Sequence, residues 1–127
     1  MIQTFLVFLG GGIGAALRHG VNVYAGRTLG LGFPWGTFIA NIVGSLAMGL
    51  LAGWFAFRAD AGINQHARLL LTTGLLGGFT TFSAFSLDTV LLWERDAYAL
   101  AAAYVIGSVG ISLVALFAGL WMIRSLG

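Results

Sequence analysis

The chain has 127 residues, of which 59% are hydrophobic and only 8% are charged, and its mean hydropathy is +0.97. A soluble domain carries about 25% charged residues, so this chain has too little charge to cover a surface that faces water. The composition therefore excludes a soluble enzyme, a nucleic-acid-binding module and a disordered tail, and it predicts one all-α membrane domain over residues 1–127.

Long uncharged stretches separate the few charges and predict four helices that cross the lipid bilayer. A membrane-spanning helix needs about 20 apolar residues to cross about 30 Å of hydrocarbon. The first uncharged stretch ends before Arg18, so its helix has to continue past this residue, whereas the later stretches are 33–57, 69–87 and 97–123. We therefore predict spans at roughly 2–24, 34–57, 68–93 and 97–123.

Small residues recur at four-residue spacing within these spans. Gly10 pairs in this way with Gly14, and Gly74 pairs with Gly78. Such spacing allows helix backbones to approach closely in lipid, where no hydrophobic force drives association. The pattern predicts tight helix packing and carries little information about function.

The six arginines divide evenly between the two sides of the predicted membrane protein. One side holds Arg18, Arg27 and Arg95, and the other holds Arg58, Arg68 and Arg124. A membrane protein is normally oriented by a bias in such charges, and this chain has almost none. Two interpretations stay open: the chain inserts in both orientations and pairs antiparallel with its own copy, or another feature sets a single orientation.

The third span contains poor helix-forming residues close to its midpoint. Two glycines, Gly77 and Gly78, are followed by the threonine pair Thr80 and Thr81. A break here frees backbone groups that lipid cannot satisfy, so it persists only where it is buried in protein or binds an ion. We predict a break near 77–81, with carbonyl groups that suit a cation. A continuous helix that packs through its glycines is the alternative.

Neutral polar side chains and aromatic rings follow one another along the last three spans. Phe82 and Phe85 lie three residues apart and share a helix face. The polar members of the set are neutral hydrogen-bond donors: Asn41, Ser45, Ser83, Ser86, Tyr104, Ser108 and Ser112. Such donors, together with the positive edges of aromatic rings, suit a small anion. A path without a fixed cation binds the anion weakly enough to release it, so these residues predict a pore for a small anion.

Three motifs resemble those of the Fluc (CrcB) family of bacterial fluoride channels. The third span carries the longest motif, GGFTTFSAFS at residues 77–86, and the stretches 10–18 and 34–44 are similar to the family's first and second helices. The chain departs from the family pattern at Ala84, where the family often has threonine, and at Asp88, where it often has glutamate.

The resemblance implies a passive channel in the bacterial inner membrane that exports cytoplasmic fluoride and so relieves its toxicity. It implies an antiparallel, dual-topology homodimer with two pores, and a structural Na⁺ on the two-fold axis held by backbone carbonyls of Gly77 and Thr80. It places Arg18 near a vestibule mouth, although a snorkelling anchor is an equal alternative. The pore residues that it implies carry aromatic rings or neutral donors: Phe82, Phe85, Asn41, Ser83, Ser86, Tyr104, Ser108 and Ser112.

Two other classes of function are compatible with four membrane spans: a coupled secondary transporter and a structural membrane subunit. No acidic residue precedes Asp60, and Asp88 is the acidic residue within a predicted span. A proton-coupled transporter generally needs a carboxylate embedded in the membrane, so the sequence disfavours that class. Stoichiometric dependence on a proton gradient would indicate a transporter, and flux through the purified chain would exclude a purely structural subunit.

Overall fold

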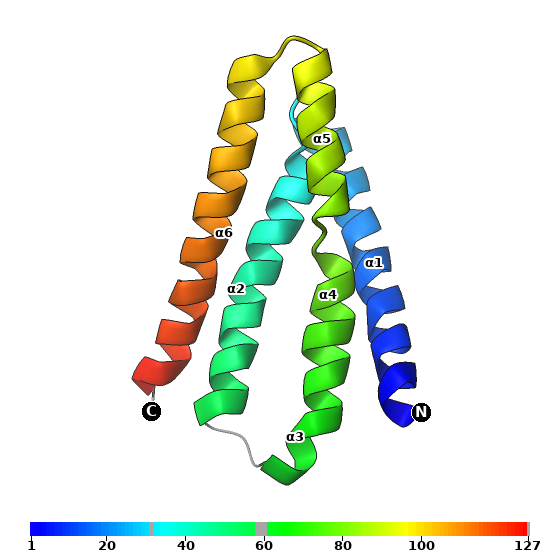
Figure 1. The fold of residues 1–127 in the computed structure, drawn as a ribbon, viewed down its shortest axis with the longest axis vertical. Coiled ribbons are helices and arrows are strands. Elements are labelled where there is room, and N and C mark those ends of the chain that lie inside the picture. The colour runs from blue at the N-terminus through cyan, green and yellow to red at the C-terminus, as the bar shows by residue number, and fades with distance from the viewer. Residues whose placement is uncertain (31, 58–60, 127) are drawn as a thin grey trace.

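Four helical segments run side by side in the computed structural model, which describes residues 1–30, 32–57 and 61–126 (Figure 1). The elements in chain order are α1 (Ile2–Leu29), α2 (Trp35–Phe57), α3 (Ala61–Arg68), the π-helix η1 (Leu69–Leu76), α4 (Gly77–Phe79), α5 (Ser83–Glu94) and α6 (Tyr98–Leu126). Four stretches are long and apolar enough to cross a bilayer: Ile2–Leu29, Trp35–Ala56, Gln65–Glu94 and Tyr98–Leu126. The predicted all-α membrane class with four candidate spans is confirmed.

The third of these stretches is assembled from short elements instead of one regular helix. The π-helix η1 leads into the single turn α4, after which Thr80 is extended, with φ −87° and ψ 159°. Helix α5 then begins at Ser83. The backbone therefore leaves the helical path at residues 80–82. The predicted break near 77–81 also covers Gly77 and Gly78, but both of these residues are helical.

Close contact between α1 and the third segment requires glycine at two facing positions, Gly14 and Gly78. A Cβ atom on Gly78 would lie 2.3 Å from the carbonyl oxygen of Gly11, and one on Gly14 would lie 2.0 Å from the carbonyl oxygen of Leu75. Glycine at these positions lets the two backbones touch, which is the packing that the four-residue spacing predicts. Glycine residues at these positions therefore serve close packing. The chain departs from the helix at the threonines that follow.

Helices α2 and α6 form a second close pair. A Cβ atom on Gly49 would lie 2.2 Å from the carbonyl oxygen of Leu116, and one on Gly119 would lie 2.6 Å from that of Leu46.

The chain reverses direction between α5 and α6 at Asp96, which has a φ of 61°. As Figure 1 shows, both termini lie at the same end of the molecule, as expected for an even number of spans.

The distribution of apolar side chains is that of a membrane protein. Large side chains on the outer surface are exposed, including Phe8 at 77% and Phe117 at 68%. The small buried core lies between α5 and α6 and consists of Phe85, Leu92, Ala101 and Tyr104. Because hydrocarbon solvates apolar side chains as well as a protein interior does, a surface of this kind suits lipid or a partner protein.

Candidate functional site

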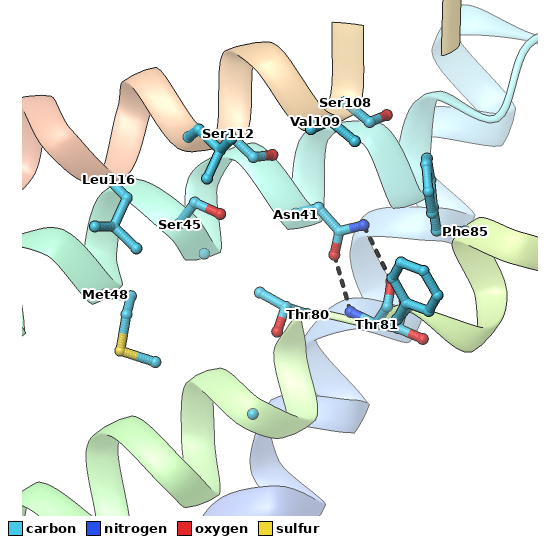
Figure 2. Close-up of a pocket in the computed structure, with 14 residues that line it drawn as sticks. Asn41, Ser45, Met48, Thr80, Thr81, Phe85, Ser108, Val109, Ser112 and Leu116 are labelled. Atoms are coloured by element: carbon cyan, nitrogen blue, oxygen red, sulfur yellow. Dashed lines mark hydrogen bonds between the residues drawn. The ribbon is translucent and has the colours of Figure 1, made fainter. Parts of the chain in front are cut away.

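A cavity of about 480 Å³ opens beside the point where the third segment leaves its helical path (Figure 2). Helices α2 and α6 form two of its walls, and residues at the interruption and the start of α5 form the rest. The polar side chains in its lining are Asn41, Ser45, Thr80, Thr81, Ser108 and Ser112. None of these polar side chains carries a formal charge, and the cavity lies within the candidate spans.

Asn41 forms hydrogen bonds with both backbone groups of Thr81, which lies in the interruption. Its Nδ2 donates to the carbonyl oxygen of Thr81 at 3.1 Å, and its Oδ1 accepts from the Thr81 amide at 2.9 Å (Figure 2). The side-chain amide therefore replaces a helical neighbour for this peptide unit. Nδ2 carries two hydrogens, and one of them makes this bond on the cavity wall.

Thr81 also contacts the first turn of the next helix through its side chain. Its Oγ1 accepts from the Ala84 amide in the first turn of α5 at 3.1 Å, so the side chain satisfies one of the free amides at that helix start. The Ser83 hydroxyl lies 3.2 Å from the same oxygen. The sequence pattern predicts the threonine pair as a helix breaker but does not predict Thr81 as a site residue. The signal that identifies it is a threonine three residues before a helical amide.

Two carbonyl groups lose their helical donors at the interruption. In a continuous helix the Thr81 amide would donate to Gly77 and the Ala84 amide would donate to Thr80. Both amides donate elsewhere, to Asn41 Oδ1 and to Thr81 Oγ1 respectively. Helix-terminal carbonyl groups of this kind can bind a cation. Among the described residues, no group of three or more histidine, cysteine, aspartate or glutamate side chains could hold a metal ion.

Arg18 lies against the interruption from the side of α1. Its Nε donates to the carbonyl oxygen of Gly78 at 3.3 Å, and the residue is half-buried. A guanidinium at the C-terminal end of a helical segment is favourable both as a hydrogen-bond donor and as a charge. The structure thus places Arg18 on the backbone beside the cavity.

The two phenylalanines of the motif differ greatly in exposure. Phe85 is 9% exposed and packs with its ring centroid 5.1 Å from that of Tyr104. Phe82 lies 5.6 Å from Phe85 between ring centroids but is 77% exposed. Both rings line the cavity. Most of the surface of Phe82 is exposed on the outside of the chain.

Ser108 provides a buried hydrogen-bond donor that faces the cavity. It is 4% exposed, and its Oγ has no hydrogen-bond partner among the described residues. Buried hydroxyl groups in folded proteins almost always have a partner, so an exception needs an explanation. Ser112 lines the same wall one helical turn further along α6, and a bound polar species would satisfy Ser108.

Tyr104 contacts one residue of this cavity, Phe85, and one residue of a second cavity, Asp88. The residue is fully buried, and its hydroxyl donates to Asp88 Oδ2 at 3.1 Å. Asp88 lines a second cavity of about 520 Å³, together with Thr37 and Asn22. Tyr104 itself lies in the core between α5 and α6, beside the first cavity.

The predicted site residues are therefore only partly gathered in one place. The cavity lining includes Asn41, Phe82, Phe85, Ser108 and Ser112. Ser83 and Ser86 are exposed side chains outside that lining, and the Ser86 hydroxyl donates to the Phe82 carbonyl of its own helix at 3.0 Å.

Four apolar helical segments with a neutral polar cavity between them define a multi-pass membrane protein. The sequence matches the family model described as CrcB-like protein, Camphor Resistance (CrcB), over residues 5–120. The chain belongs to this family.

Curated relatives cover nearly the whole chain. It is 60% identical to the "Fluoride-specific ion channel FluC" of Rhodopseudomonas palustris (strain BisB5), over 95% of this chain and 96% of that protein. It is 59% identical to the protein of the same name from Methylobacterium nodulans, over 100% of both chains. It is 57% identical to "Fluoride-specific ion channel FluC 2" of Nitrobacter hamburgensis, over 98% of this chain and 99% of that protein. These matches group the chain with ion channels and not with enzymes.

Proposed function

We propose that the chain forms a passive channel that conducts fluoride. The observation that carries this proposal is the buried Ser108 hydroxyl, which lies without a partner in a cavity lined by neutral donors. Fluoride is a small anion that accepts strong hydrogen bonds, and hydrogen bonds to an ion are roughly twice as strong as those between neutral groups. The relatives named as fluoride-specific channels support the choice of ion.

Selectivity for fluoride follows from the size of the anion and the nature of the donors. Hydroxyl groups and the edges of Phe82 and Phe85 offer short-range contacts to an anion that has lost part of its water. A larger anion such as chloride accepts weaker hydrogen bonds and fits less well between them. No cationic side chain belongs to the described cavity lining, so the anion is bound weakly enough to leave.

The working unit in this proposal is an antiparallel homodimer with two pores. The cavity is open, and the 77% exposed ring of Phe82 lines it, so a second copy would both cover the cavity and bury the ring. An inverted copy is compatible with the even division of arginines between the two sides. One of those arginines, Arg58, lies outside the described residues.

A structural Na⁺ at the two-fold axis is part of the same proposal. The carbonyl groups of Gly77 and Thr80 would be its ligands, because their helical donors are engaged by Asn41 and Thr81. Uncharged oxygen atoms suit a hard monovalent cation. The ion would supply positive charge at the interruption and hold the two copies together.

In the cell, the proposed channel exports fluoride across the bacterial inner membrane. Neutral HF crosses the bilayer from an acidic exterior and ionises in the neutral cytoplasm, which traps F⁻ inside. An inside-negative potential, worth about 2.3 kcal/mol per charge at 100 mV, then drives the anion outward through the pore. Export of this kind relieves fluoride toxicity without any energy source of its own.

Fluoride efflux from proteoliposomes that contain the purified chain tests the proposal. We expect rapid efflux that follows voltage, with much slower chloride efflux from the same vesicles. Fast chloride efflux, or no fluoride efflux, would contradict the proposal. Fluoride flux coupled stoichiometrically to a proton gradient would indicate a secondary transporter instead.

A further inference from the structure

A smaller cavity continues the line of the first one between α2 and the third segment. Its volume is about 190 Å³, and its lining is Met48, Ala52, Phe55, Ala56, Arg68 and Thr72. It lies toward the end of the molecule at which α3 is found, because Arg68 ends that helix. Along α2, Asn41, Ser45 and Met48 line the first cavity, and Ala52 and Phe55 line the second. Positions three and four residues apart share a helix face, so one face of α2 lines both cavities.

Met48 is the residue that the two cavity linings share. Its side chain is half-buried. In Figure 2 it lies beside Leu116, at the opposite end of the first cavity from Phe85. A methionine side chain is unbranched and flexible, and its thioether offers an anion no hydrogen bond. An apolar side chain between two cavities that each contain polar residues forms a constriction, which an ion can pass only if the opening is wide enough for the ion or its water.

The smaller cavity contains a cationic residue, Arg68, which suits an entrance for anions. Arg68 is exposed and is the positive charge in that lining, and the Thr72 hydroxyl, one turn further, donates to the Arg68 carbonyl. A cation at the mouth of a cleft raises the local concentration of anions. The order along the path is therefore a charged mouth, an apolar constriction and then a chamber of neutral donors.

We propose that Met48 is the constriction of a water-filled path that joins the cavity at the interruption to a mouth at Arg68. The assignment deepens the proposed function, on which its role in fluoride selectivity rests. A shorter side chain at position 48 would widen the opening and admit chloride, and a bulkier one would close it. The side chain would thus act on the size of the conducted anion, whereas Asn41 and Ser108 act on its hydrogen bonding.

The absence of cysteine from the chain allows a test that needs no fluoride current. In Met48→Cys, a thiol on a water-filled path ionises and reacts with a water-soluble methanethiosulfonate reagent, because the thiolate is the nucleophile. The matched control is Val114→Cys on α6, close to Leu116 but 67% exposed on the outer surface and outside both linings. We expect reconstituted Met48→Cys to react at least about tenfold faster than the control. Equal rates would overturn the proposal.

Ion flux through a second pair of variants tests the constriction itself. We expect Met48→Ala to raise the ratio of chloride to fluoride efflux several-fold, and Met48→Phe to lower fluoride efflux about tenfold. Val114→Ala should change neither rate, and size-exclusion chromatography should give one elution volume for all the proteins. Unchanged efflux in both Met48 variants would overturn the assignment while leaving the fluoride channel intact. Wild-type vesicles without fluoride efflux would contradict the proposed function alone, because the thiol rates would still decide whether Met48 lines a water-filled path.

Discussion

Asn41 stabilises the irregular backbone and also presents a polar group to the cavity. Both hydrogen bonds to Thr81 require an amide, with one donor and one acceptor. A carboxylate cannot donate to the Thr81 carbonyl, and it adds a negative charge to a cavity of neutral donors. The identity of this one side chain therefore controls both the local backbone and the passage of an anion.

The substitution Asn41→Asp tests this double role. We expect fluoride efflux to fall below detection, because the added charge repels the anion and one hydrogen bond to Thr81 is lost. Size-exclusion chromatography should still find the assembled protein, since Asn41 faces the cavity. Unaltered efflux in proteoliposomes would remove Asn41 from the conduction path.

Ser108→Ala should lower fluoride efflux without lowering the stability of the protein. Removing a buried hydroxyl that has no partner among the described residues should leave the stability unchanged or raise it slightly. Hydrogen bonds to charged groups contribute about 1.5–3 kcal/mol, so fluoride efflux at low concentration should fall about tenfold or more. The control is Ser125→Ala, an exposed position near the end of α6. A loss of stability without a loss of efflux would show that the hydroxyl serves the fold alone.

The exposure and the long-range partners of single residues could not be predicted from the sequence. Phe82 and Phe85 are equivalent by spacing, and their different exposure arises because Tyr104, on another helix, covers one of them. The bond between Arg18 and the Gly78 carbonyl joins residues 60 positions apart. Helical periodicity identifies residues on one face of one helix, but it contains no information about which faces of different helices meet.

The third segment owes its conformation to its neighbours as much as to its own residues. Composition correctly indicates poor helix formers near its midpoint, yet Gly77 and Gly78 remain helical, and α1 packs directly on Gly78. The extended residue is Thr80, and the next peptide unit is stabilised by α2. Local propensity thus identifies the region, and tertiary contacts decide which residues leave the helix.

Gly14→Ala tests the close packing of α1 on this segment. The new Cβ would lie 2.0 Å from the Leu75 carbonyl oxygen, so the two backbones must separate. Overpacking of this kind costs about 1–3 kcal/mol, and the midpoint of thermal unfolding in detergent, followed by tryptophan fluorescence, should fall. Gly20→Ala on the same helix has open space around its Cβ and should not lower the midpoint. Equal midpoints for the two variants would contradict the packing argument.

For the whole molecule, the few charges matter through their placement. Four apolar segments and their order follow directly from the gaps between charges, because bilayer thickness fixes the length of an uncharged stretch. The relative positions of those segments follow from glycine contacts, which a four-residue spacing suggests without naming the partner helix.

The even division of arginines predicts that small charge changes control orientation. Two lysines added to the connection near residue 95 should fix that side in the cytoplasm, as reported by a topology-sensitive fusion at the C-terminus. The unmodified chain should give both orientations, and chains forced into one orientation should no longer pair with an inverted copy. A single orientation for the unmodified chain would contradict the antiparallel dimer.

The hydrogen bonds at the interruption have a consequence for biogenesis. A ribosome makes the chain from its N-terminus, so Arg18 and Asn41 are synthesised before Gly78 and Thr81, the residues whose backbone groups they bind. The irregular backbone therefore enters the bilayer after its two partners have been made. Moving the third segment to the start of the chain by circular permutation would reverse this order, and nascent chains would have to insert an irregular peptide that has no polar partner yet.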